Sequence, residues 1–384
     1  MPFIGNKPTA VPLSGADIQD GTITSADLQS GVIQNQSAFK NIIINGDMSI
    51  AQRGTSESGI TSSGYHTVDR WRTALVTGGT WTQTQETDVP TGQGFAKSMK
   101  LDCTTANGSL SASSLLIFRT LIEGQNLQYL KKGTSSAESL TLSFWVKSNK
   151  TGTYTASIYD NDNSRQIAKS YTIDASDTWE KKTITYAGDT IGAFDNDNNK
   201  SLYVDFYLVA GSNYTSGTLA TAWESYSSVN SAVGQVNLAD STSNYINITG
   251  VQLEAGTTAS DFEFLPVDVN LDRCLRYYQV VADATSDTQV ICNAASYSTS
   301  SAFGVLSFIK EMRAAPSLDQ TSGSAFYNYS NNGNSDTFDS FIAAQGSTKN
   351  IRIVNADSIT ITAGQSGWFS ARTTGGILAL DAEL

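Results

Sequence analysis

SLTLSFWVKS, residues Ser139–Ser148, and SLYVDFYLVA, residues Ser201–Ala210, are the two clearest indications of the fold in this sequence. Large apolar residues stand at every second position of both: Leu140, Leu142, Phe144 and Val146, then Leu202, Val204, Phe206 and Leu208. Side chains two residues apart share one face of a β-strand, so each stretch predicts a strand with one apolar face. Further segments with strand-like composition follow at spacings of roughly ten residues, which is typical of an antiparallel sandwich.

The composition also favours strands and polar turns over long helices. Of the 384 residues, 39% are hydrophobic and only 16% are charged, with a formal net charge of −12. No cluster of Lys and Arg is visible that could follow a phosphate backbone, so nucleic acid is set aside as a partner. Cys103, Cys274 and Cys292 show no CxxC spacing, so we expect neither a disulfide framework nor a zinc site.

Residues 1–40 are predicted to form an extended arm. SGADIQDGTITSADLQSGVI, residues 14–33, is one short unit written twice. Its large apolar residues are Ile18, Ile23, Leu28 and Ile33. So few apolar side chains cannot build a core alone, and we expect other copies of the chain to cover them in a homotrimer. The alternative is that the arm docks on a different protein; either way it is an attachment segment.

The rest of the chain is predicted to be all-β and to form two domains. Residues 41–265 are expected to be an antiparallel jelly-roll β-sandwich, and residues 267–384 a smaller β domain. Pro266 marks the boundary. The residues at helical spacing after it predict a short amphipathic helix with Asn270 as its N-cap. Those residues are Leu271, Cys274, Leu275 and Tyr278.

Several motifs are more specific than the β texture. They are NIIINGDMSIAQRGTS (residues 41–56), TVDRW (67–71), ITGVQLEAGTTASDFEF (248–264), LDRCLRYYQ (271–279), MRAAPSL (312–318) and LDAEL (380–384). In this order the chain resembles bacteriophage tail-fibre proteins that carry a carbohydrate-binding-like jelly roll and a C-terminal β domain. Its repeat-bearing N-terminus resembles those of marine phage fibres.

The resemblance implies a virion protein, made in the bacterial host cytoplasm, whose arm joins other tail proteins and whose outer domains attach to the host through surface glycans or another receptor. Within the motifs, we expect salt bridges or turn caps at the sandwich edge from Arg53, Asp69, Arg70 and Glu254. Tyr277 and Tyr278 are expected to pack the helix against the sandwich. No signal-peptide pattern and no apolar run of membrane-spanning length is visible, so no membrane insertion is expected.

No catalytic motif stands out. The sequence has a single histidine, His66, and no G-x-S-x-G, HExxH or Walker pattern. We therefore expect a non-enzymatic adhesin. Two alternatives stay open: a purely structural virion protein without a glycan site, and a glycan-degrading enzyme that uses a pair of carboxylates.

Aromatic residues on the polar sides of the strands are candidates for glycan binding. Trp145, Tyr203 and Tyr207 alternate with the apolar residues of the two stretches, and Tyr159 ends a neighbouring strand. Aromatic rings can stack on sugars, so these four residues predict a glycan-binding face. The alternatives are that a neighbouring copy or the second domain covers them, or that they belong to the core.

The C-terminal domain offers a second candidate surface. AFYNYSNNGNSDTF, residues 325–338, places Phe326, Tyr327 and Tyr329 beside a Gly/Asn loop. Exposed loops often carry binding residues, so these three aromatics predict a receptor-contacting tip. The alternative is an ordinary hairpin end.

Two acidic loops are candidates for calcium. YDNDNSR contains Asp160 and Asp162, and FDNDNNK contains Asp195 and Asp197. Oxygen ligands at alternate positions suit calcium, and the resemblance to carbohydrate-binding jelly rolls implies a structural calcium ion. The alternative is Asx-rich turns without metal. No other cofactor is expected.

Overall fold

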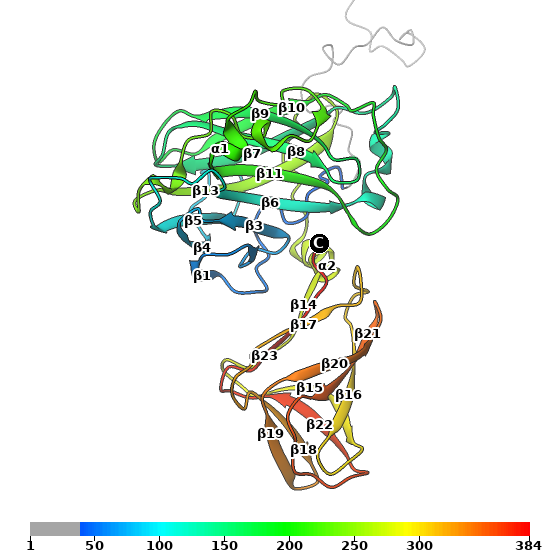
Figure 1. Ribbon diagram of the computed structural model, residues 1–384. Helices are drawn as coiled ribbons and strands as arrows, with labels where there is room; N and C mark the ends of the chain where they lie inside the picture. The colour runs from blue at the N-terminus through cyan, green and yellow to red at the C-terminus, as the bar shows by residue number, and fades with distance from the viewer. Residues whose placement is uncertain (1–38) are drawn as a thin grey trace, which may run out of the picture. The chain divides into compact units, whose positions relative to one another are not determined.

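The alternating stretches form strands β7 (Leu140–Ser148) and β11 (Lys200–Ala210) of a two-sheet sandwich (Figure 1). The computed structural model describes residues 39–384, so the predictions for Ile18, Ile23, Leu28 and Ile33 lie outside the described residues. Phe144 of β7 and Phe206 of β11 meet edge to face, with ring centroids 4.9 Å apart. This contact joins the two sheets through the apolar faces that the alternation predicts.

Both sheets of the sandwich are antiparallel. The six-stranded sheet runs, in spatial order, β1 (Ser56–Ile60), β4 (Thr80–Glu86), β5 (Ser98–Thr105), β13 (Tyr245–Ala255), β7 and β10 (Glu180–Tyr186). The seven-stranded sheet runs β12 (Glu224–Ser225), β9 (Arg165–Ile173), β8 (Gly152–Asp160), β11, β6 (Leu115–Glu123), β3 (Trp71–Val76) and β2 (Gly64–Tyr65). The prediction of an all-β, jelly-roll sandwich is confirmed.

The C-terminal domain has its own apolar core between two further antiparallel sheets. The three-stranded sheet runs β14 (Tyr278–Asp283), β23 (Ile377–Asp381) and β17 (Ser317–Gln320). The seven-stranded one runs β19 (Asn334–Phe338), β18 (Tyr327–Asn331), β22 (Ser366–Ala371), β15 (Gln289–Ser296), β16 (Ala302–Ser307), β21 (Asn350–Asn355) and β20 (Phe341–Gly346). Burying each large apolar side chain in such a core contributes about 1.5–3 kcal/mol.

The helix that opens this domain differs from the prediction. Helix α2 spans Val267–Leu275, so it begins before Asn270 and ends before Tyr278, which lies in β14. Asn270 is buried and is no N-cap: its Nδ2 donates to Asp47 Oδ1 at 3.1 Å and its Oδ1 accepts from the backbone of Asn45 at 3.2 Å. Tertiary hydrogen bonds therefore use this side chain. No helix among the described residues has the length and apolar character that a membrane crossing requires.

A buried carboxylate holds the end of α2 against the sandwich. Glu123, at the end of β6, is fully buried and accepts two hydrogen bonds of 2.8 Å from the guanidinium of Arg276. The hydroxyl of Tyr277 donates to the same carboxylate. Burial alone raises the pKa of Glu123, but the hydrogen bonds from Arg276 and Tyr277 outweigh it and lower the pKa below its usual range. The expected packing role of Tyr277 is therefore a charge-assisted contact.

The terminal LDAEL motif makes a second contact between the C-terminal domain and the sandwich, through Glu383. Arg70 is buried, donates to Glu383 and to the Leu121 carbonyl (2.6 Å), and stacks on the ring of Tyr277 at 3.5 Å. Arg53 also pairs with Glu383, at 3.5 Å. These ion pairs confirm the salt bridges expected of Arg53 and Arg70.

The other motif residues fall at the same edge and in a turn. Arg53 pairs with Asp381 at 3.4 Å and lies over the ring of Tyr278 at 3.6 Å. The carboxylate of Glu254 accepts hydrogen bonds from the backbone and the hydroxyl of Ser260, which confirms the expected turn cap. These motif residues therefore join the C-terminal domain to the sandwich or close a turn.

Asp69 lies beside this cluster as a buried carboxylate bonded by Gln52 rather than by an arginine. Its Oδ1 accepts from the Gln52 backbone at 2.9 Å, and its Oδ2 accepts from the Gln52 amide. Burial raises the pKa of Asp69 to about 6, although the hydrogen bonds from Gln52 and the charge of Arg53 act in the opposite direction. The folded chain therefore binds this proton more tightly than an unfolded chain, in which the ordinary value is 3.8.

We expect this proton to make stability depend on pH. Between pH 3.8 and pH about 6 the folded state keeps the proton that the unfolded state has lost, so the free energy of unfolding falls as pH rises through this window. The expected loss is about 2–3 kcal/mol. In Asp69→Asn this part of the slope is absent. Urea unfolding of both proteins between pH 4 and pH about 7 measures the difference, and parallel pH profiles would contradict the assignment.

Candidate functional site

The outer face of the sandwich's seven-stranded sheet carries aromatic and charged residues. On β11, Tyr203, Asp205 and Tyr207 alternate with the core residues and so point away from the core. The register places Tyr159 of β8 beside Tyr203, and Arg119 of β6 beside Asp205. Three of the four predicted glycan-binding residues, Tyr159, Tyr203 and Tyr207, are therefore brought to one face.

A long segment, residues 211–236, covers part of this face. It contains helix α1 (Ser212–Thr215), strand β12 and the 3₁₀ turn Ser228–Asn230. Ala232 of this segment packs in one apolar cluster with Tyr207, and Gln235 Oε1 accepts from the backbone of Thr155 at 2.8 Å. Tyr207 is only 4% exposed as a result. The chain itself thus covers Tyr207, which cannot stack on a ligand.

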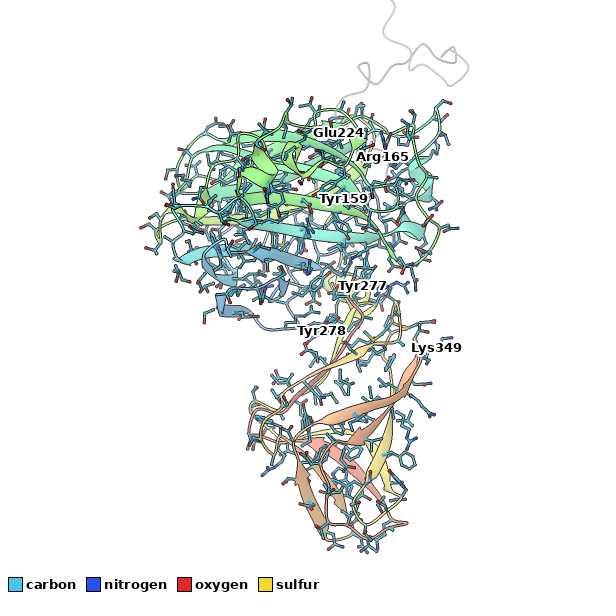
Figure 2. All side chains as sticks on the ribbon, in the orientation of Figure 1. Tyr159, Arg165, Glu224, Tyr277, Tyr278 and Lys349 are labelled. Atoms are coloured by element: carbon cyan, nitrogen blue, oxygen red, sulfur yellow. The ribbon has the colours of Figure 1, made fainter. Side chains whose placement is uncertain are left out.

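At the edge of the covered part of the face, three tyrosines form a cluster. The ring of Tyr159 lies 5.3 Å from that of Tyr203 and 5.0 Å from that of Tyr226, both edge to face. Tyr226 is 45% exposed, Tyr159 is half-buried, and Tyr203 forms the floor of the cluster. In Figure 2 Tyr159 lies near Glu224 and Arg165, which belong to the adjoining strands β12 and β9.

A buried ion pair adjoins the tyrosines. Arg119 Nη2 donates to Asp205 Oδ2 at 2.6 Å, and the guanidinium of Arg119 lies 5.1 Å from the centre of the Tyr203 ring. Burial raises the pKa of Asp205 above its usual range even though Arg119 opposes the shift. Arg119 Nε and Asp205 Oδ1 are both buried and have no hydrogen-bond partner within residues 39–384. Such atoms are costly unless a hydroxyl or water satisfies them.

Sequence patterns reveal only part of this site. Asp205 and Arg119 could have been inferred, because both alternate with core residues on strands of the same sheet. Tyr226 could not, because it lies in an irregular turn and reaches the sheet only through the path of residues 211–236.

Trp145 does not join the tyrosines. It lies on β7 in the six-stranded sheet, opposite Lys181 of β10 and Thr249 of β13. The outer faces of the two sheets are separated by the sandwich core, so Trp145 and the tyrosine cluster are on opposite sides of the domain. The two stretches do have aromatic residues on their polar faces, but they belong to different sheets.

The prediction of a receptor-contacting tip is wrong for Tyr327 and Tyr329, two of its three residues. Residues 325–338 do contain the β18–β19 hairpin, as the alternative expects, but Tyr327 and Tyr329 are fully buried. Tyr327 packs on Phe341 at 4.7 Å. Phe326 is half-buried against the same core. The period of two places both tyrosines on the inward face of β18, so neither can contact a receptor.

A lysine occupies the position expected of calcium beside Asp160. The ammonium of Lys132 lies 2.5 Å from Asp160 Oδ2 and 3.1 Å from Asp189 Oδ2. It also donates to the carbonyls of Ile191 and Gly192, at 2.8 and 2.7 Å. Four oxygens therefore surround a buried protein cation, and Asp160 has no carboxylate oxygen to spare for a metal because its Oδ1 caps the following turn.

The other three calcium candidates line one open cavity. Asp162, Asp195 and Asp197 surround it together with Lys200 and Arg313, and its volume is about 480 Å³. Asp162 Oδ2 accepts from the backbone of Asp195 at 3.0 Å, and Asp197 caps the turn at Asn199. No group of three or more acidic, His or Cys side chains in residues 39–384 is arranged to hold a metal ion. Asp162 and Asp197 therefore make turn contacts of the Asx type, and a calcium ion in this loop stays a prediction.

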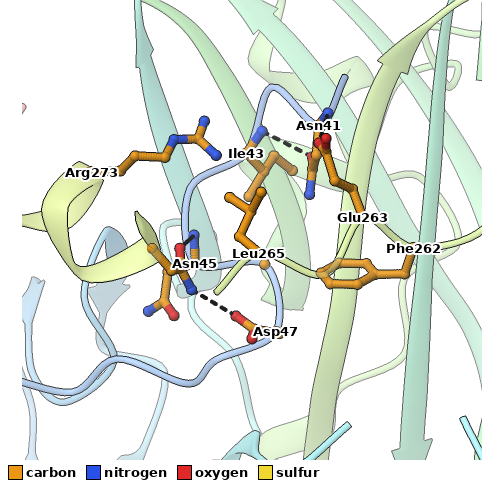
Figure 3. Close-up of a pocket in the computed structure, with 10 residues that line it drawn as sticks. Asn41, Ile43, Asn45, Asp47, Phe262, Glu263, Leu265 and Arg273 are labelled. Carbon is orange, nitrogen blue, oxygen red and sulfur yellow. Dashed lines mark hydrogen bonds between the residues drawn. The ribbon is translucent and has the colours of Figure 1, made fainter. Parts of the chain in front are cut away.

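The cavity in Figure 3, beside α2, is too small to bind a ligand. It is lined by Asn41, Asn45, Asp47, Asn270 and Arg273 among others, and its volume is about 10 Å³. A cavity of this size has room for one water molecule at most.

The sequence matches no protein-family model and no curated protein. Among solved structures, the chain is similar to the enzymatically active domain of tailspike protein 4 of bacteriophage CBA120, with TM-score 0.29 and 16% identity over 57% of this chain. It spans 22% of that domain. It is also similar to a putative sugar binding protein from Bacteroides thetaiotaomicron, with TM-score 0.28 and 15% identity over 56% of this chain and 99% of that one.

A third similar structure is the family 11 carbohydrate-binding module from Clostridium thermocellum in complex with a β-1,3-1,4-mixed-linked tetrasaccharide. The TM-score is 0.27, and the identity is 12% over 53% of this chain and 98% of that one. All three TM-scores are below 0.5, a level at which the likeness carries no argument about what this chain does.

We expect Lys132→Met to destabilise the sandwich by about 3–5 kcal/mol, because it leaves the fully buried Asp160 without its cation, whereas Asp189 keeps its ion pair with Arg165. Lys131→Met is the matched control. Lys131 pairs only with the exposed Glu138, so its loss should cost less than about 1 kcal/mol. Thermal unfolding with and without calcium or EDTA completes the test. A higher unfolding temperature of the wild type in calcium would contradict the replacement of the ion by Lys132.

Proposed function

We propose that the chain is a non-enzymatic, glycan-binding adhesin of a phage tail fibre, and that the jelly roll binds surface sugars of the bacterial host. The observation that carries the proposal is the cluster of Tyr159, Tyr203 and Tyr226 beside the Arg119–Asp205 pair. The exposed ring of Tyr226 offers an apolar surface for the face of a sugar ring. The virion role is supported by the motifs that resemble tail-fibre proteins.

The site is suited to binding rather than to bond cleavage. A sugar stacked on Tyr226 would bring its hydroxyls toward the Arg119–Asp205 pair, whose Arg119 Nε and Asp205 Oδ1 are among the buried atoms without a hydrogen-bond partner in residues 39–384. Hydrogen bonds to charged groups are stronger than neutral ones and fix the orientation of the ring. The side chain of Asp205 is 3% exposed and is held by Arg119, so it is poorly placed to protonate a glycosidic oxygen.

The tyrosine site is tested by Tyr226→Ala. We expect an affinity for the host glycan about tenfold lower, equivalent to about 1.4 kcal/mol, because the exposed stacking surface is lost. Binding is measured by calorimetry after a glycan array has identified a ligand, and by attachment of the fluorescently labelled chain to host cells. Tyr129→Ala is the matched control, because Tyr129 is 50% exposed on the same domain outside the cluster.

Equal losses in the two tyrosine variants would contradict the site, and no binding to any glycan or cell would favour a purely structural virion protein. The proposal includes no catalytic step. Release of new reducing ends from host polysaccharide by the purified chain would replace it with the glycan-degrading alternative.

The proposed trimer depends on the repeat in residues 14–33. Replacing its apolar residues, Ile18, Ile23, Leu28 and Ile33, by Ser should leave the jelly roll folded and reduce the mass measured by light scattering from three chains toward one. The physical reason is that the few apolar residues of the repeat cannot build a core alone. The circular-dichroism spectrum controls for folding, and an unchanged mass would contradict the shared-arm trimer.

A further inference from the structure

The outer face of the seven-stranded sheet in the C-terminal domain exposes aromatic and apolar side chains. Trp368 on β22 is 42% exposed, and Val305 on β16 and Ile342 on β20 are also exposed. The inward residues of these strands, such as Phe369, pack in the domain core. The exposed residues therefore alternate along the strands with the core residues and lie on the outer face of the sheet. No segment within residues 39–384 covers this face in the way that residues 211–236 cover the sandwich sheet.

The strand register orders the polar groups around Trp368. Trp368 lies between Ser330 of β18 and Asn293 of β15. Phe303 and Arg352, on β16 and β21, follow across the same face, where Phe303 pairs with Ala295 and Arg352 pairs with Val305. Two strands separate β22 from β21, so Trp368 and Arg352 stand about 14 Å apart at the usual strand spacing. Hydroxyl and amide groups lie next to the tryptophan on both sides.

Arg352 is a cation without a carboxylate. Its guanidinium lies over the ring of Phe303 at 4.7 Å, which fixes its plane on the sheet surface. Within residues 39–384 it forms no ion pair, and its Nε is buried without a hydrogen-bond partner. Among the strand residues that share this face by register, Arg352 is the only charged side chain. In a chain with a net charge of −12, a face with one free cation and no carboxylate is complementary to an anion.

We propose that this face is a second binding site and that it takes an acidic oligosaccharide, a chain of sugars that carries carboxylate groups such as a uronate polymer. Trp368 stacks on one sugar ring, Asn293 and Ser330 bond its hydroxyls, and Arg352 binds a carboxylate farther along the chain. The spacing between Trp368 and Arg352 across the sheet suits an extended ligand of several rings. This site lies in a different domain from the tyrosine cluster and differs from it in ligand class.

The test measures binding of tetragalacturonic acid, with neutral maltotetraose as the comparison ligand. The wild type should bind the acidic ligand, and high salt should weaken this binding because the ion pair is near the surface. Arg352→Gln and Trp368→Ala should each lower the affinity about tenfold. Lys349→Gln is the matched control: it removes the same charge three residues from Arg352, but Lys349 is exposed and pairs weakly with Glu311 at 3.7 Å (Figure 2).

Tyr226→Ala separates this proposal from the function proposed for the jelly roll, because it should leave tetragalacturonate binding unchanged. No binding of the acidic ligand by the wild type overturns the proposal, as does equal binding of maltotetraose that Arg352→Gln does not affect. A second copy of this chain is the competing occupant of the face, and sedimentation of the full chain tests for it. If Trp368→Ala and Arg352→Gln dissociate an oligomer while Lys349→Gln does not, the face is an interface between copies and the proposal fails. Circular dichroism confirms that each variant is folded.

Discussion

A β-strand sends alternate side chains to opposite faces, so every sheet of this chain has a second face that the core between the sheets cannot cover. The outer face of the six-stranded sheet carries Trp145 and ion pairs such as Lys100 with Asp102 at 3.0 Å. The sandwich's seven-stranded sheet instead carries Tyr159, Tyr203 and Tyr207, and the chain crosses it with residues 211–236. The candidate site is what this crossing leaves open.

Buried charges fix the segments around that site. Lys132 joins the turn after β8 to residues 189–192 by binding Asp160, Asp189 and two carbonyls. Tyr159 immediately precedes Asp160, so the cation that orders the turn also orders the end of the strand that carries the ring. An isolated buried charge would be very costly, but a lysine with four oxygen partners is satisfied. This local order is what a metal ion often supplies in other loops, and here a side chain supplies it.

The sequence predicts faces better than it predicts which faces meet. The period of two in residues 139–148 and 201–210 correctly separates core from outer residues, yet nothing in that period says that Trp145 and Tyr203 belong to different sheets. The same rule applied to residues 325–338 would have placed Tyr327 and Tyr329 in the core, since they alternate with Asn328 and Ser330. The neighbouring Gly/Asn turn suggested a loop instead. The prediction that Asn270 caps the start of the helix is also wrong. Its side chain instead bonds Asn45 and Asp47, which are distant in sequence, and no local pattern predicts such contacts.

Ion pairs between the two domains connect the surfaces that carry the two proposed sites. Glu123 at the end of β6 binds Arg276 and Tyr277, and Glu383 binds Arg70 of the sandwich, so charge-assisted contacts hold the C-terminal domain to the sandwich. The function proposed for the jelly roll and the inference for the C-terminal domain would place two sugar sites on one chain, and a polymer that bound both would bind with higher overall affinity without any new contact. None of these ion pairs includes a residue of either proposed site. They bear on the proposal because they hold the domain that carries Trp368 to the sandwich that carries Tyr226.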